Sequence, residues 1–194
     1  MRIAVLASGN GSNFQAIAEA IQQKHLDADI VLLFSDNPQA KVLQRAEALG
    51  IDAQAFAPKD FSAKSIYEAE LLHLLEEKHV ELVVLAGYMR LIGPVLLEAF
   101  PKKIVNIHPS LLPAFPGLHG IRDAYEAGVP ETGVTVHYID KGIDTGPIIA
   151  QQRIPVSQQD TLESLEKKIH QVEHRLYPAV LQQIIKQDKE RSTE

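Results

Sequence analysis

Several features are missing from this sequence of 194 residues, and each absence narrows what the protein can do. It has no cysteine, which excludes disulfide bonds, thiolate catalysis and zinc sites with cysteine ligands. No apolar run approaches the ~18 residues that a membrane span requires, and no basic segment followed by a long apolar stretch opens the chain. We therefore expect a soluble cytoplasmic protein.

Clusters of positive charge are also scarce. The formal net charge is −6, and no run of lysine or arginine is longer than a pair. Because nucleic-acid binding depends on the neutralisation of phosphates, these features argue against nucleic acid as the main ligand. A small molecule is the better expectation.

The sequence does contain a regular alternation of strand-like and helical segments. With 45% hydrophobic residues it can bury a full core, and we expect one domain over residues 1–194. The alternation predicts an α/β fold with a mostly parallel twisted sheet flanked by helices on both faces. The expected strands cover residues 3–7, 30–34, 53–57, 82–86, 104–108, 133–138 and 148–156, with the last two antiparallel.

Two of the expected helices carry further predictions. Residues 62–79 are expected to form a helix whose charges face solvent, with a buried side made of Ile66, Leu71, Leu72 and Leu75. The helical period continues from residue 161 to 187, where Pro178 should kink the helix. The charged residues 188–194 should form a frayed tail.

The strand at residues 104–108 carries two polar side chains. Side chains two apart on a strand point to one face, so Asn106 and His108 should lie together. An amide N–H can hold a developing oxyanion, and a histidine can donate or accept the travelling proton, as acyl-type transfer requires. The alternative is that the two residues merely close a strand before the turn at Pro109.

A glycine-rich loop at residues 8–13 separates the first strand from its helix. Gly9 and Gly11 allow positive φ and close backbone approach, and the helix supplies free N–H groups, so the loop suits a phosphate monoester. The dinucleotide fingerprint needs a glycine where Phe14 stands, although Asp36 ends the second strand where a ribose-binding acid would lie. Alternatively, Ser12 only caps the helix.

The connector at residues 139–146 is rich in glycine and acidic residues. If it crosses the strand ends, Asp144 reaches His108, where a carboxylate would orient the imidazole and raise its pKa. Asp140 competes for this role, and both acids could instead cap turns. We expect His137 to be a structural residue. No metal site is expected, because the only ligand-like pair, His170 and His174, lacks the glutamate base of a metalloprotease.

Four segments together resemble the phosphoribosylglycinamide formyltransferases, a family of folate-dependent enzymes of purine synthesis. They are the loop at 8–13, Ala86-Gly87-Tyr88-Met89-Arg90, the segment 106–113 and the loop through Asp144. The resemblance covers nearly the whole chain. It implies a Rossmann-like formyltransferase fold, with a phosphate-binding half at residues 1–100 and a folate-binding and catalytic half at 101–187.

The resemblance also implies a reaction and its residues. The amine of the ribotide, 5-phosphoribosylglycinamide, would attack the formyl group of 10-formyltetrahydrofolate, a co-substrate, without a metal. The implied catalytic residues are Asn106, His108 and Asp144, and the implied ribotide-binding residues are Gly11, Ser12, Asn13 and Glu173. The implied folate-binding residues are Lys64, Met89, Arg90, Leu91, Ile92, Asn106 and Asp140. Lys64 replaces the arginine of many relatives, which keeps the charge but loses the bidentate fork.

Three other functions compete with this one. Formyltetrahydrofolate deformylase shares the chemistry but has an additional regulatory module, and methionyl-tRNA formyltransferase has an additional nucleic-acid-binding barrel; we expect neither addition here. A catalytically silent α/β module that binds a phosphate ligand is the third. We expect small-molecule substrates, no nucleic-acid or membrane partner, and a monomer or weak homodimer.

Overall fold

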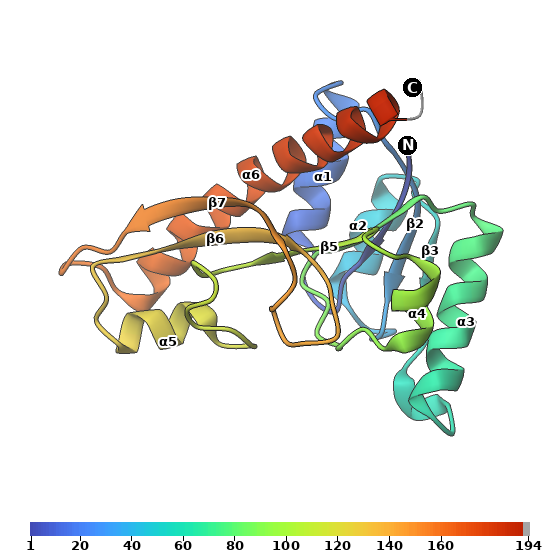
Figure 1. Ribbon diagram of the computed structural model, residues 1–194, viewed down its shortest axis with the longest axis horizontal. Helices are drawn as coiled ribbons and strands as arrows, with labels where there is room; N and C mark the ends of the chain where they lie inside the picture. Colours follow the sequence, from blue (N-terminus) through green and yellow to red (C-terminus); the bar gives the residue numbers. More distant parts are fainter. Residues whose placement is uncertain (192–194) are drawn as a thin grey trace.

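The computed structural model describes residues 1–191 as one α/β domain built on a single sheet (Figure 1). The strand order is β3-β2-β1-β4-β5-β6-β7. Strands β1 to β5 run parallel to one another, whereas β6 pairs antiparallel with both β5 and β7 at one edge of the sheet. The predicted fold class is therefore confirmed. The strands are β1 (Arg2–Leu6), β2 (Asp29–Ser35), β3 (Ala53–Ala55), β4 (Leu82–Leu85), β5 (Ile104–His108), β6 (Glu131–Tyr138) and β7 (Ile148–Pro155).

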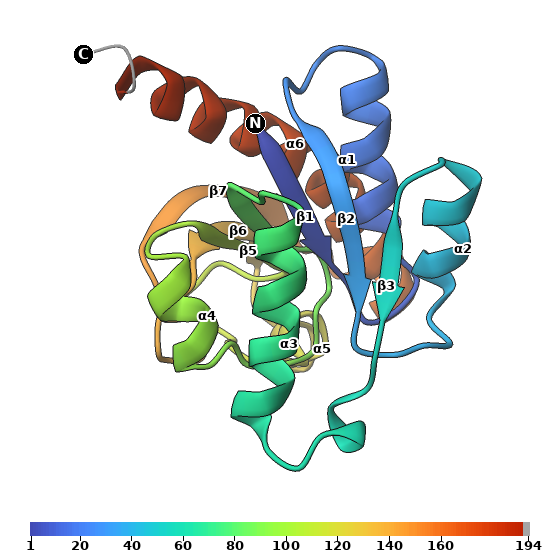
Figure 2. The same cartoon turned by 90° about the vertical axis from the view of Figure 1, so that its right-hand side faces the viewer.

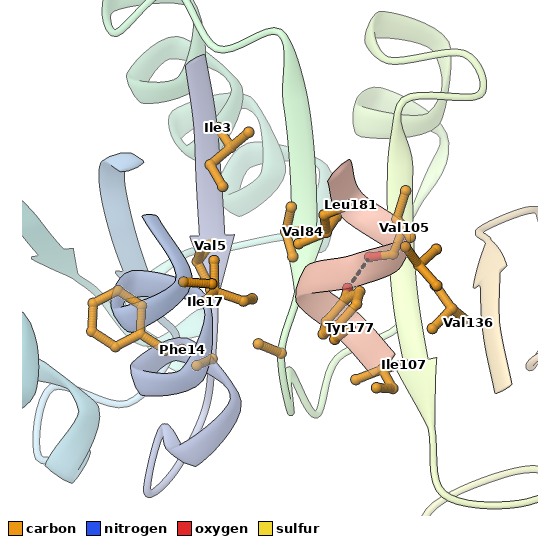
Figure 3. Packing of buried hydrophobic residues seen from close by; sticks show 14 of the residues in the cluster. Ile3, Val5, Phe14, Ile17, Val84, Val105, Ile107, Val136, Tyr177 and Leu181 are labelled. Atoms are coloured by element: carbon orange, nitrogen blue, oxygen red, sulfur yellow. Dashed lines mark hydrogen bonds between the residues drawn. The ribbon is translucent and has the colours of Figure 1, made fainter. Parts of the chain in front are cut away.

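Helices cover both faces of the sheet (Figure 2). Because side chains alternate along a strand, Ile3 and Val5 of β1 enter one buried cluster and Ala4 and Leu6 enter the other. The helices are α1 (Ser12–Gln22), α2 (Lys41–Ala48), α3 (Lys64–Glu77), α4 (Pro94–Ala99), α5 (Gly120–Glu126) and α6 (Leu162–Arg191). Residues of α1 and α6 pack into the first cluster (Figure 3), together with residues of α2 and α5, and residues of α3 and α4 complete the second. Within residues 1–191, none of the helices combines the length and apolar character that a membrane crossing needs.

The buried side of α3 differs from the prediction. Leu71 and Leu75 are buried as expected, but Ile66 is 51% exposed. Tyr67 takes its place, because the phenol ring packs against three phenylalanine rings of the core. The same rotation buries Glu68, which is only 3% exposed, so the prediction that the charges of this helix all face solvent is wrong.

Helix α6 joins distant parts of the chain. Pro178 lies inside it, and the helix continues to Arg191, so residues 188–191 are helical rather than frayed; residues 192–194 lie outside the described part. The buried Tyr177 hydroxyl is 2.8 Å from the carbonyl oxygen of Leu85 and 3.0 Å from that of Val105. Figure 3 shows this tyrosine on α6 with its bond to Val105. The two bonds connect α6 to β4 and β5.

Candidate functional site

The carboxyl end of β5 presents two polar side chains at the centre of the sheet. Val105 and Ile107 are buried in the apolar core, while Asn106 is half-buried and His108 is 4% exposed. Asn106 lies opposite Leu85 at the end of the neighbouring β4. The predicted alternation along this strand is therefore confirmed.

Both ring nitrogens of His108 have an oxygen nearby. Nε2 lies 2.8 Å from the carbonyl oxygen of Phe115, and because a carbonyl oxygen only accepts, Nε2 carries a proton. Nδ1 lies 3.5 Å from Oδ2 of Asp144, which also accepts a 2.7 Å hydrogen bond from the backbone N–H of Gly117. The carboxylate therefore faces the ring nitrogen that does not contact Phe115.

His137, which we expected to be only structural, lies in this group. Its Nδ1 donates to the carbonyl oxygen of Tyr138 at 3.0 Å, and burial lowers its pKa, so the neutral ring has an acceptor at Nε2. That atom is 3.3 Å from the amide nitrogen of Asn106 and 3.6 Å from Oδ1 of Asp144. The neutral ring of His137 thus accepts one N–H of the Asn106 amide and orients it. The second N–H of that amide makes no hydrogen bond within the described residues. The antiparallel pairing that sets His137 opposite Asn106 was the signal that could have found it.

The two acids of the connector have different surroundings. Oδ1 of Asp140 accepts hydrogen bonds from the backbone N–H of Gly142 at 2.9 Å and from the hydroxyl of Thr145 at 2.7 Å, and these bonds lower the pKa of Asp140. Asp140 therefore braces the turn. Asp144 has a φ of 54°, a conformation that aspartate tolerates better than most residues, and its side chain is the one that reaches His108.

The loop before α1 has the geometry of a phosphate cradle. Gly11 has a φ of 77° and is the N-terminal cap of the helix, whose first N–H groups belong to Ser12 and Asn13. A Cβ at Gly11 would lie 2.3 Å from Cγ2 of Val42, so both the backbone conformation and the available space require glycine. Arg45 braces the loop from α2, with its Nε 2.7 Å from the carbonyl oxygen of Asn10.

An acidic residue of α6 lies beside this loop. Glu173 is 4% exposed, and its Oε2 accepts hydrogen bonds from Nδ2 of Asn13 at 3.3 Å and from Nδ1 of His170 at 2.8 Å. The bond to Glu173 raises the pKa of His170. The fold thus brings together the four predicted ribotide residues, and it adds His170, whose position beside the loop could not be read from its spacing in the sequence.

One cavity of about 600 Å³ connects these features. It extends from the phosphate loop past the ends of β4 and β5 to the connector. Every predicted site residue lines it except Lys64, which begins α3 with its Nζ 3.8 Å from Oε1 of Glu68. A role for Lys64 therefore stays a prediction. The predicted residues that line the cavity are Gly11, Ser12, Asn13, Met89, Arg90, Leu91, Ile92, Asn106, His108, Asp140, Asp144 and Glu173.

A second hollow of about 820 Å³ lies between α1 and α6. It shares only Ser12 with the first cavity and contains neither His108 nor Asp144, so the predicted catalytic residues lie in the first. Among residues 1–191, no three histidine, aspartate or glutamate side chains gather in a way that could hold a metal ion.

Comparison with known proteins gives one consistent result. The formyl transferase family model matches residues 1–181. The phosphoribosylglycinamide formyltransferase of Bacillus subtilis (strain 168) is 52% identical over 184 residues, which cover 95% of this chain and 94% of that protein. The enzyme of the same name from Escherichia coli (strain K12) is 38% identical over 93% of this chain and 85% of that protein. The crystal structure of phosphoribosylglycinamide formyltransferase from Bacillus halodurans superposes with a TM-score of 0.93 at 51% identity, covering 95% of each chain.

Proposed function

Because the chain belongs to the formyl transferase family, among the phosphoribosylglycinamide formyltransferases, we propose that it uses 10-formyltetrahydrofolate as the formyl donor and 5-phosphoribosylglycinamide as the acceptor. The product would be formylglycinamide ribotide, an intermediate of purine synthesis. One observation carries the proposal: the Asn106, His108 and Asp144 group lies in the same cavity as the phosphate loop.

The two ends of the cavity suit the two substrates. At one end, the backbone N–H groups after Gly11 would bind the ribotide phosphate, with Glu173 accepting from the ribose hydroxyls. At the other end, the loop from Met89 to Ile92 and the connector from Asp140 would enclose the pterin. A ribotide and a folate held in this way would meet at the end of β5, where proximity alone lowers the barrier.

The reaction would be a direct transfer through a tetrahedral intermediate. The neutral amine of the ribotide attacks the formyl carbon, and the carbonyl oxygen becomes an oxyanion. The free N–H of Asn106 and the imidazolium of His108 donate to that oxygen. The Nε2–H of His108, which in the structure donates to the Phe115 carbonyl, would turn to the oxyanion. Asp144 balances the charge of the imidazolium.

Collapse of the intermediate completes the transfer. The bond between the formyl carbon and N10 of the folate breaks as a proton reaches N10, by way of water, and the amine loses a proton. No covalent intermediate with the protein is needed. We propose that the enzyme acts in the cytoplasm on these small molecules, as a monomer or weak homodimer.

A direct assay tests the proposal. The protein is mixed with 10-formyltetrahydrofolate, with and without the ribotide, and free tetrahydrofolate is measured. Product that forms only when the ribotide is present supports the transferase. Product that forms without the ribotide would identify a deformylase, and no product in either case would favour a silent ligand-binding module.

A further inference from the structure

The buried carboxylate of Asp36 takes no part in the proposed reaction. Asp36 follows β2 directly, and its side chain is only 4% exposed. In dinucleotide-binding α/β folds an acid at this position binds a ribose hydroxyl. Here its Oδ2 instead accepts a 2.7 Å hydrogen bond from Nε of Arg90, which belongs to the loop between β4 and α4. Its buried Oδ1 has no hydrogen-bond partner within residues 1–191.

The backbone of that loop is held by other residues. The N–H of Met89 donates to the hydroxyl of Ser8 at 2.8 Å. At the other end, the N–H of Gly93 donates to Oε1 of the buried Glu68 at 2.6 Å. Because these two bonds fix the backbone on either side of Arg90, the contact with Asp36 acts mainly on the direction of the Arg90 side chain.

The bond to Asp36 uses only one edge of the guanidinium. Arg90 is half-exposed, lines the cavity, and has a pKa raised by its hydrogen bond to Asp36. With Nε engaged, the two Nη groups make no hydrogen bond to the described residues. Together they form a planar pair of donors that matches the two oxygens of a carboxylate.

We propose that Asp36 is a positioning residue that aims the Arg90 fork at a carboxylate of the folate donor's glutamate tail. The inference rests on the proposed function, because the tail is the anionic part of that donor. Asp36 has two opposite effects on the tail: it orients the guanidinium, and it neutralises part of the positive charge. The proposal is that orientation dominates, since an oriented guanidinium can donate two charged hydrogen bonds to one carboxylate at the same time.

Asp36→Asn tests the proposal, since the amide keeps the volume but loses the charge. We expect the KM for 10-formyltetrahydrofolate to rise about tenfold, on the order of one charged hydrogen bond. The KM for the ribotide and kcat should stay within about twofold, a split that general damage to the fold would not produce. With 10-formyltetrahydropteroate, which lacks the glutamate, the variant and the wild type should have the same KM.

Two further variants make the result specific. Asp52→Asn is the matched control, because it also removes a carboxylate paired with a cation, Lys78, and neither residue lines the cavity. Arg90→Lys keeps the charge without the fork and Nε, and should raise the KM for the glutamylated donor even if the Asp36 variant folds poorly.

A lower KM for 10-formyltetrahydrofolate in Asp36→Asn would mean that Asp36 mainly neutralises Arg90. If the KM of this variant rose equally for the folate and pteroate donors, Arg90 would not meet the tail. Either result overturns the inference while leaving the proposed function intact. The proposed function is tested separately by wild-type turnover with both substrates.

Discussion

The carboxylate of Asp144 meets His108 with Oδ2, which lies 3.5 Å from Nδ1 of the imidazole. Both side chains are largely buried, so the attraction between them is screened less than in a surface pair. The same oxygen accepts the N–H of Gly117, and this bond ties the carboxylate to the loop after β5. Two loops therefore fix the position of the Asp144 carboxylate against His108.

Replacing Asp144 by asparagine should lower turnover by ~10²–10⁴-fold while both substrates bind almost as before. Asparagine also tolerates positive φ, so the variant removes the charge without straining the loop. The amide cannot balance the positive charge that His108 carries in the proposed mechanism when it donates to the oxyanion, so the loss should fall on kcat rather than on KM.

Steady-state kinetics with both substrates measures the effect. Asp140→Asn is the control, because Asp140 braces the same connector without contacting His108. Its kcat should fall far less than that of the Asp144 variant. If kcat falls in the Asp140 variant and not in the Asp144 variant, the roles of the two acids must be exchanged.

Alanine at Gly11 should weaken ribotide binding by at least about tenfold and leave folate binding within about twofold. The added Cβ would collide with Val42 and push the loop away from the position in which its N–H groups meet the phosphate. Gly50→Ala is the matched control, since Gly50 also has a positive φ, 66°, but has open space around it. Calorimetry with each ligand compares the two variants. Equal losses for ribotide and folate would mean that the loop is only structural.

Glutamine at His137 should remove part of the pH dependence of stability. Burial lowers the folded-state pKa of His137, so as the pH falls below about 6.5 the unfolded chain takes up this proton before the folded protein does. The wild type thereby loses free energy of unfolding towards acid pH, by at most about 1.4 kcal/mol per pH unit. The variant lacks this contribution.

Urea unfolding of both proteins between pH 5 and pH 7 checks the prediction. The difference between their free energies of unfolding should change with pH in favour of the variant as the solution becomes more acidic. Parallel curves would show that His137 is protonated equally in the folded and unfolded states, which would contradict its role as an acceptor for Asn106.

Phenylalanine at Tyr177 should lower the free energy of unfolding by about 1–3 kcal/mol, because the carbonyl groups of Leu85 and Val105 lose a buried donor. Tyr125→Phe on α5 is the control, since its hydroxyl makes no hydrogen bond within the described residues. Denaturant titration of both variants measures the difference. A Tyr177 variant as stable as the control would mean that water replaces the hydroxyl.

Local patterns were enough to predict the sheet and the strand that carries Asn106 and His108. Strand β4 is a short, fully buried apolar run, and the period of two along β5 sets Asn106 and His108 on one face. The glycine-rich loop could also be predicted, because a position that needs a positive φ, such as Gly11, favours glycine in the sequence itself. These features depend on residues close together in the chain.

Other parts of the site depend on contacts between distant segments. In the sequence, Glu68 has the pattern of a charge on an exposed helix face, but in the structure it accepts the N–H of Gly93 at the start of α4. Asp36 stands where a ribose-binding acid would lie, but in the structure it pairs with Arg90 of another loop. His137 enters the site through the register of two antiparallel strands. No local period encodes such pairings, since tertiary packing overrides the local preference of each segment.

The bond between Asn13 and Glu173 spans 160 positions of the chain. During synthesis on the ribosome, the phosphate loop and α1 therefore emerge long before the helix that covers them is made. Until then the apolar side of α1, including Phe14 and Ile17, has no α6 to bury it. The nascent chain thus exposes this apolar surface for most of its synthesis. The contact between the loop at residues 8–13 and Glu173 is among the last parts of the protein to form.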